Sequence, residues 1–122
     1  MHVYFGTIAA SLGALGVAMG AFGAHAIKER VDARMLEIWN TATLYLFIHA
    51  IALLLVAIIS QSRETPITLA GNLFIAGTVI FSGSLYTLVL TGHKWLGAIT
   101  PIGGTLFIVG WVSLAIALLP RS

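Results

Sequence analysis

The side chain of His49 lies about midway along an apolar stretch, residues 40–60. Imidazole changes its charge near neutral pH, and an ionisable group inside a membrane helix is a functional candidate by default. Three roles stay open: a neutral ring hydrogen-bonded to another helix, a proton relay or ligand contact, and metal or haem ligation. Haem ligation shared with His25 is the least favoured, because at about 1.5 Å of rise per residue the two histidines lie at different depths.

Other polar side chains gather in one half of the apolar region, at ends of the apolar stretches that reach the same side of a membrane. They are His25, Asn40, Thr41, Thr43, Tyr45, Ser82, Ser84, Tyr86, Thr87 and Thr100. Hydroxyls in membrane helices often bond to their own i−4 carbonyl or across one helix contact. Alternatively, the group forms a polar half-cavity for a lipid headgroup, an ion or a small solute. Nearby cations would favour an anion there: Lys28, Arg30, Arg34 and Lys94.

Familiar catalytic chemistry is missing from the sequence. We find no H-E-x-x-H, no P-loop, no dinucleotide-binding glycine motif and no acidic residue inside an apolar stretch to complete a Ser-His-Asp set. The chain has no cysteine, which excludes disulfides, thiolate metal sites and iron–sulfur clusters. We therefore expect no catalytic residues, no metal site and no cofactor. A membrane enzyme that acts on a lipid, with His25 or His49 as base, is the least favoured of the functions that stay open.

Four apolar stretches must position these residues, and each has about the 20 residues that a helix needs to cross a bilayer. They cover residues 3–26, 40–60, 67–91 and 96–119, and the ten charged residues all lie outside them. Only 8% of the residues are charged, against about 25% in soluble domains. The sequence thus predicts a single integral membrane domain over residues 1–122.

The first stretch ends in Ala24-His25-Ala26, which matches the pattern of a signal-peptidase site. Residues 1–10 contain no Lys or Arg to form the basic region of a signal peptide, and the apolar run is longer than such peptides carry. We expect the first helix to be retained.

Short breaks at residues 61–66 and 92–95 allow only tight hairpins, so the predicted fold is an all-α, antiparallel (up-down-up-down) four-helix bundle. After the first stretch, Val31, Met35 and Trp39 recur at helical spacing. This pattern predicts an amphipathic lead-in that makes the second helix 32–60, with Asp32 near its N-cap. Trp39 is expected to anchor it at the membrane interface.

The cations predict an orientation. Four of them follow the first and third stretches, whereas Arg63 and Arg121 belong to the other side. Since positive charges favour the cytoplasm, both termini are predicted outside.

Small residues mark helix contacts in membranes because they allow close approach. We expect packing glycines at Gly16, Gly20, Gly83 and Gly103. Close packing within one chain is the favoured interpretation, and self-association through Gly16-x-x-x-Gly20 is the alternative.

Four ordered motifs carry a resemblance to a known family. They are Gly20-Ala21-Phe22-Gly23-Ala24-His25-Ala26; Trp39 with Ala42, Tyr45 and His49-Ala50; Phe81-Ser82-Gly83-Ser84-Leu85-Tyr86; and Ile99-Thr100-Pro101-Ile102-Gly103-Gly104 ahead of Gly110-Trp111. Nearly the whole chain resembles the domain-of-unknown-function family 423, the YgdD-like small inner-membrane proteins, to which mitochondrial transmembrane protein 256 is related. The resemblance implies a four-helix protein of the bacterial inner membrane and supplies no activity. Its motif positions largely coincide with the polar group, so the candidate ligand-binding residues are His25, Trp39, Tyr45, His49, Ser82, Ser84, Tyr86 and Thr100.

These observations predict a non-enzymatic bundle that binds membrane lipid or a partner membrane protein. A homo-oligomer of the chain is one form that this bundle could take. The sequence shows no basic stripe for nucleic acid. The alternative is a small transporter or channel for an ion or small solute, with His49 as gate or relay.

Overall fold

The computed structural model describes residues 2–60 and 66–120, and the regular elements in these ranges are all helical. In a bilayer this is expected, because a helix satisfies its own backbone hydrogen bonds where no water is available. The elements are η1 (His2–Tyr4), α1 (Phe5–Phe22), η2 (Gly23–Ile27), α2 (Lys28–Arg30), α3 (Ala33–Ile59), α4 (Pro66–Thr91), η3 (Lys94–Ala98) and α5 (Thr100–Ala117). The predicted all-α fold class is confirmed.

Within the described ranges, four helical segments are long and apolar enough to cross a membrane. They are Phe5–Arg30, Ala33–Ile59, Ile67–Thr91 and Lys94–Ala117. The first segment continues past residue 26, where the apolar stretch ends, because the π-helical turn η2 joins α1 to α2 without a break.

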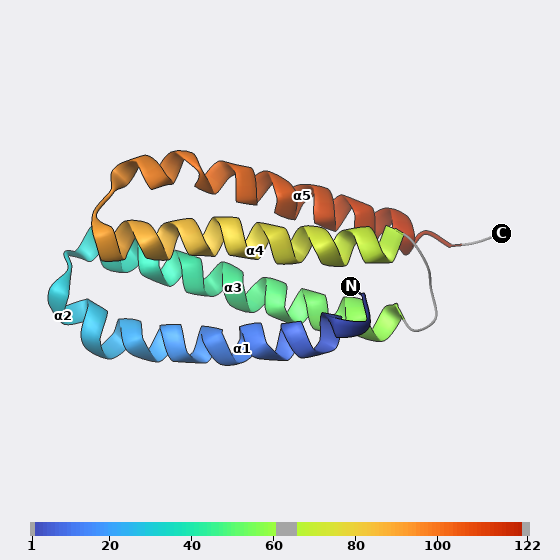
Figure 1. Cartoon of the computed structure of the whole chain (residues 1–122), viewed down its shortest axis with the longest axis horizontal. Helices are drawn as coiled ribbons and strands as arrows, with labels where there is room; N and C mark the ends of the chain where they lie inside the picture. Colours follow the sequence, from blue (N-terminus) through green and yellow to red (C-terminus); the bar gives the residue numbers. More distant parts are fainter. Residues whose placement is uncertain (1, 61–65, 121–122) are drawn as a thin grey trace.

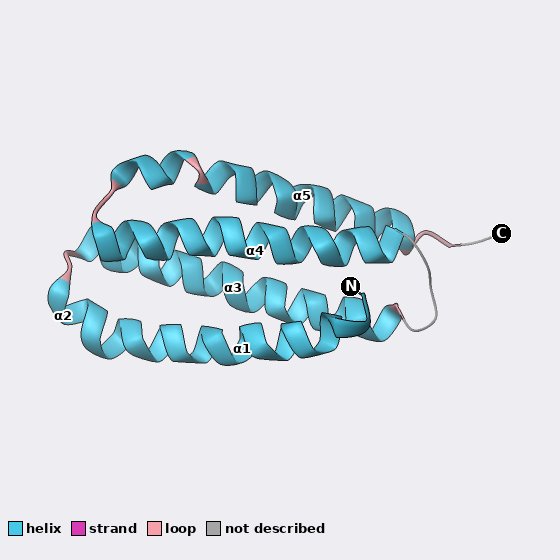
Figure 2. Cartoon of the chain, in the orientation of Figure 1, coloured by secondary structure: helices cyan, strands magenta, loops and turns pink. Residues whose placement is uncertain are grey.

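The helices run antiparallel in chain order (Figure 1). α1 packs along α3, α3 packs against α4, and α4 packs against α5. The two described turns, after α2 and after α4, lie at the same end of the bundle (Figure 2). α4 contacts both α3 and α5, so those two helices lie on either side of it. We call the boundary along which two neighbouring helices face each other a seam, and α3 and α5 share one.

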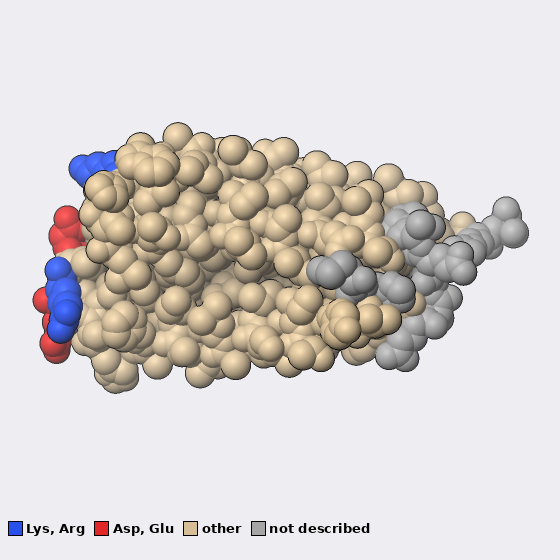
Figure 3. Space-filling view, in the orientation of Figure 1, with Lys and Arg blue, Asp and Glu red and all other residues tan. Residues whose placement is uncertain are grey.

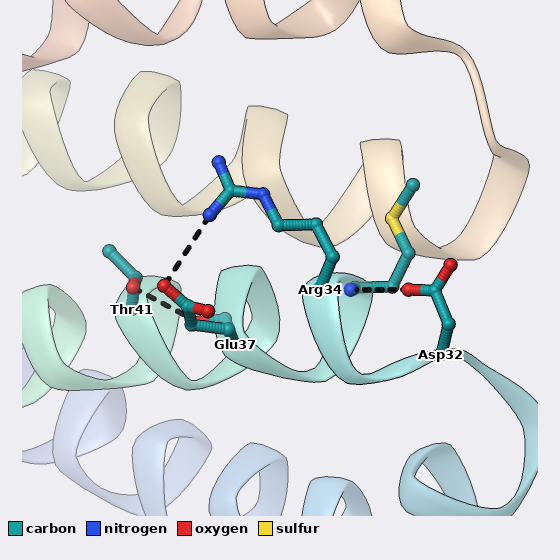
Figure 4. Close-up of polar contacts among 5 residues, drawn as sticks. Asp32, Arg34, Glu37 and Thr41 are labelled. Atoms are coloured by element: carbon teal, nitrogen blue, oxygen red, sulfur yellow. Dashed lines mark hydrogen bonds and ion pairs between the residues drawn. The ribbon is translucent and has the colours of Figure 1, made fainter.

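The N-terminus of α3 is capped as the sequence predicts. The Asp32 side chain accepts a hydrogen bond of 2.8 Å from the backbone N–H of Met35, drawn in Figure 4. At the same end of the helix, Arg34 and Glu37 form an exposed ion pair of 3.4 Å. Such exposed i,i+3 pairs contribute only about 0.3–0.5 kcal/mol, so the cap and the packing fix this end of the helix.

Trp39 does not face outward, as the predicted interfacial anchor would. Its ring is 0% exposed, and its indole N–H donates to the Met19 carbonyl over 2.8 Å. The cause lies in α1 and η2: a Cβ on Gly23 would come within 2.6 Å of the Trp39 ring, so the missing side chain makes room for the indole. The helical spacing of Trp39 reflects core packing between α1 and α3.

Charged side chains of the described residues gather at one end of the molecule, and the long sides of the view in Figure 3 show none. They are Lys28, Glu29, Arg30, Asp32, Arg34, Glu37 and Lys94. This distribution suits a bilayer around the sides, since a charge near its centre costs about 2.5–3.5 kcal/mol or more. Arg63 and Arg121, which the predicted orientation also uses, lie outside the described residues.

Glycines form the close helix contacts, but not all of those that the sequence suggests. Gly103 lies so close to α4 that an added Cβ would be 2.5 Å from the Phe81 backbone nitrogen. An added Cβ on Gly16 would lie 2.7 Å from the Phe47 ring. An added Cβ on Gly20 would make an ordinary van der Waals contact with Thr43. Gly83 differs from the expectation, because a Cβ there would meet no atom within 4 Å.

The face that carries Gly16 and Gly20 is therefore directed at α3. Gly16 is buried, and Phe47 of α3 covers it. This arrangement agrees with packing inside one chain, and it leaves that face unavailable for the alternative, self-association through the same two glycines.

Candidate functional site

The polar residues that the sequence places together are separated into pairs by the structure. Ser84 and Thr100 join α4 to α5 through their hydroxyls at 2.6 Å. Thr43 and Tyr86 join α3 to α4 at 2.7 Å. Ser82 donates to a backbone carbonyl of α3, that of Ala42, at 2.8 Å.

These hydrogen bonds connect neighbouring helices. Each hydroxyl has a protein partner, and a polar group with a partner can be buried at little cost. Interhelical hydrogen bonds thus engage five hydroxyls of the polar group, and the polar half-cavity itself stays a prediction.

Exposed hydroxyls form the hydrogen bonds within their own helix that were expected as one interpretation of the sequence. Those that donate to the carbonyl four residues earlier in their own helix are Ser11, Thr41, Thr87, Thr91 and Thr105. Such a bond satisfies the donor of a hydroxyl within its own helix.

His25 lies apart from the other candidates. It is exposed in η2, at the charged end of the bundle. The described residues contain no group of three or more His, Cys, Asp or Glu side chains that could hold a metal ion.

His49 is 3% exposed, and hydrogen bonds engage both of its ring nitrogens. The indole N–H of Trp111 on α5 donates to Nε2 over 3.0 Å, and Nδ1 lies 2.8 Å from the Tyr45 carbonyl oxygen. Because an indole can only donate and a carbonyl can only accept, the proton of a neutral His49 must be on Nδ1.

The geometry thus assigns His49 a neutral ring of one tautomer. Protonation of Nε2 would set two N–H groups against each other and remove the bond between α3 and α5. In this arrangement neither nitrogen has a free position for a metal or for a relayed proton. His49 acts as a fixed acceptor that orients Trp111.

A continuous set of aromatic rings surrounds this pair. The His49 ring stacks on Phe107 with 3.5 Å between ring centroids and 8° between planes. Tyr45 lies 4.5 Å from Phe81 by the same measure, and 6.1 Å from Phe107 with an interplanar angle of 22°. Rings contributed by α3, α4 and α5 therefore meet in one place.

An open groove of about 390 Å³ borders these rings. Tyr45 and His49 line it from α3, Phe81 lines it from α4, and α5 contributes a row of residues. That row is Pro101, Gly104, Thr105, Phe107, Ile108 and Trp111. The groove lies among residues of the membrane-spanning helices, and its lining is largely apolar.

The groove includes two of the eight candidate residues, Tyr45 and His49; Ser82, Ser84, Tyr86 and Thr100 do not line it. Sequence reasoning missed the α5 wall. One signal could have revealed it: Gly104, Ile108 and Trp111 follow an i, i+4, i+7 spacing, which places them on one face of the helix.

The chemistry available in the groove is that of binding. Its lining has no acidic residue, no cysteine and no serine, and its histidine is fully hydrogen-bonded. Apolar and aromatic surface with a few polar groups is typical of a ligand site.

Comparison with known proteins places the chain among bacterial membrane proteins. The family model described as "Protein of unknown function (DUF423)" matches residues 19–104. UPF0382 membrane protein SAB0533 of Staphylococcus aureus (strain bovine RF122 / ET3-1) is 49% identical over 110 residues, which are 87% of this chain and 90% of the relative. UPF0382 membrane protein YwdK of Bacillus subtilis (strain 168) is 43% identical over 105 residues, 84% of this chain and 85% of the relative.

No solved structure gives a significant match to the chain. The matched region contains the first three of the four motifs noted above and most of the fourth, and the relatives cover nearly the whole chain. The chain therefore belongs to the DUF423 family of membrane proteins.

Proposed function

We propose that this protein is a non-enzymatic membrane protein that binds a lipid-like molecule in the groove between α3 and α5. One observation carries the proposal: the groove is lined by residues of the membrane-spanning helices, and its lining is largely apolar. Its volume of about 390 Å³ lies within the range of ligand sites, about 300–1,000 Å³.

The position of the groove selects the kind of occupant. A ligand that reaches it from the side comes out of the bilayer, where apolar molecules are dissolved. Trp111 is 41% exposed and Ile108 is 66% exposed, so the α5 wall is accessible from the hydrocarbon region. A water-soluble ion or solute would have to cross lipid to reach the same place.

Gly104 provides a sharp test of this function. A Cβ at Gly104 would meet only the Phe81 ring, at 3.9 Å, so a larger side chain can fill the groove without a clash. Gly83 is the matched control, because a Cβ there would meet nothing within 4 Å and Gly83 does not line the groove. Gly104→Leu and Gly83→Leu thus make the same change inside and outside the site.

Native mass spectrometry of the protein in mild detergent measures the outcome. We expect one retained lipid-sized adduct per chain in the unmodified protein and in Gly83→Leu, and its loss in Gly104→Leu. Equal retention in all three proteins, or no adduct on the unmodified protein, would contradict the proposal.

We also propose that the protein lies in the bacterial cytoplasmic membrane with its charged end in the cytoplasm and both termini outside. Lys28, Arg30, Arg34 and Lys94 at that end support this orientation. The chain has no cysteine, so single-cysteine variants can be labelled without background. A cysteine at Glu29 should resist an impermeant maleimide in intact cells; labelling there before lysis would reverse the orientation.

A further inference from the structure

The groove offers a ligand one uncommitted hydrogen-bonding group, the hydroxyl of Tyr45. The other polar side chains of the lining are engaged: Thr105 donates to the Pro101 carbonyl, and Trp111 donates to His49. The Tyr45 hydroxyl has no hydrogen-bond partner within residues 2–60 and 66–120, and its side chain is 36% exposed at the groove. Hydrocarbon cannot satisfy such a group, so an occupant with an acceptor oxygen gains from contact with it.

The absence of charged side chains from the groove lining further restricts the chemical class of the ligand. The groove lining contains no Lys, Arg, Asp or Glu, and the charged side chains of the described residues lie at the end of the bundle. An ionised headgroup would find no counter-charge in the groove. The part of the ligand that the groove holds is therefore uncharged.

The rings of the lining favour a flat molecule. The planes of Tyr45 and His49 differ by 15°, those of His49 and Phe107 by 8°, and those of Tyr45 and Phe107 by 22°. Of these three rings only that of Tyr45 is accessible, at 36% exposure against 3% for His49 and 4% for Phe107. A flat ligand ring can therefore stack on Tyr45, because offset-stacked aromatic pairs are favourable beyond the area that they bury. A flexible alkyl chain would gain nothing from this alignment.

We infer that the ligand is an uncharged ring lipid of the quinone class, with a ring carbonyl oxygen that accepts a hydrogen bond from Tyr45. The ring lies along the aromatic wall, and the hydrocarbon tail leaves the groove toward the bilayer. This inference rests on the proposed function and names the ligand class for the same site.

Two probes with the same tail separate the contribution of the carbonyl from that of the apolar surface. A decyl-substituted benzoquinone carries the carbonyls, and decylbenzene lacks them. Their affinities for the full chain in detergent are measured by equilibrium dialysis. We expect the quinone to bind the unmodified protein more tightly than decylbenzene does.

Tyr45→Phe removes the hydroxyl and keeps the ring, so the fold and the wall are preserved. We expect this variant to bind the quinone about two- to tenfold more weakly, the range for one hydrogen bond, and to bind decylbenzene unchanged. Gly104→Leu should lose both probes, and Gly83→Leu should keep both. A thermal melt of each variant verifies that it is folded.

The outcomes separate a failure of the inferred ligand class from a failure of the proposed function. Loss of both probes in Gly104→Leu with unchanged quinone affinity in Tyr45→Phe would overturn the ligand class and leave the proposed function in place. Equal affinity of the two probes for the unmodified protein would overturn the class as well. Unchanged binding in Gly104→Leu would overturn both proposals.

Discussion

Two seams of the molecule contain aromatic rings from α5, and only one of them is closed. Between α4 and α5, two rings lie against glycines: Phe107 lies over Gly77, and Phe74 lies over Gly110. Between α3 and α5, the rings of His49 and Trp111 meet each other, and the groove remains open beside them. The glycines opposite Phe107 and Phe74 thus let α4 and α5 approach each other closely.

The difference teaches how glycines should be interpreted in this bundle. Gly103 is a packing residue, since the Phe81 backbone lies directly against it. A Cβ on its neighbour Gly104 would meet only the Phe81 ring, at 3.9 Å, and Gly104 lines the groove. Two adjacent glycines thus have different roles, one in closing the α4–α5 seam and one in leaving room beside it.

The largest effect is expected at Gly103. The methyl group of Gly103→Ala would lie 2.5 Å from the Phe81 backbone nitrogen, and a backbone cannot move aside as a side-chain tip can. We expect a loss of about 3 kcal/mol or more in unfolding free energy, at the upper end of overpacking costs. A melt in detergent measures it, with Gly104→Ala as the control that should stay within about 0.5 kcal/mol of the unmodified protein. Equal melting of both variants would remove the distinction between the two glycines.

The next effect concerns the bond that joins α3 to α5. Trp111→Phe leaves the Nε2 acceptor of His49 buried without its donor, and an unsatisfied buried group costs about 1–3 kcal/mol. Trp95→Phe is the control, because Trp95 is 64% exposed at the end of the bundle and should change stability little. Chemical unfolding in mixed micelles compares the two variants. A larger loss of unfolding free energy for Trp95→Phe than for Trp111→Phe would show that the hydrogen bond from Trp111 to His49 does not stabilise the contact between α3 and α5.

Ser84→Ala tests the closed seam through a smaller contribution. It removes the 2.6 Å hydrogen bond to Thr100, and single interhelical bonds in membranes average about 0.6 kcal/mol with a maximum near 1.7. We expect a loss in that range, measured as a shift in unfolding free energy. A loss well beyond 2 kcal/mol would mean that Ser84 belongs to a wider network than this one pair.

The smallest effect, and one of opposite sign, is expected at Thr78. Among the described residues, its hydroxyl is buried without a hydrogen-bond partner. Thr78→Val should therefore leave stability unchanged or raise it by about 0.5 kcal/mol. Thr43→Val makes the same replacement where the hydroxyl bonds to Tyr86, and it should destabilise by about 0.6–1.7 kcal/mol. The same change in stability for both variants would show that the Thr78 hydroxyl has a partner of its own.

Sequence predicts the helices well because the bilayer imposes length and apolar character on each of them separately. Asp32 as the cap of α3 follows from local chemistry for the same reason. The predicted role of Trp39 as an interfacial anchor is wrong, since its amphipathic spacing fits a core as well as an interface. Only the contact with Gly23, distant in sequence, decides between them.

The site was predicted only in part. Tyr45 and His49 are recognisable as polar residues in an apolar helix, but the partner of His49 is Trp111, 62 positions away. The hydroxyls of Ser82, Ser84 and Thr100 lie in the expected half of the bundle, and spacing alone does not show that each is paired across a helix contact. Pairing depends on the rotation of each helix about its axis, which hydrophobic patterns fix poorly when all faces are apolar.

An experimental density map of the protein in a lipid nanodisc tests the central claim most directly. We predict elongated non-protein density between Tyr45 and Trp111, with the Trp111 indole still bonded to His49. A seam closed by the Tyr45 and Trp111 side chains, with no room between them for a ligand, would contradict the proposed binding site.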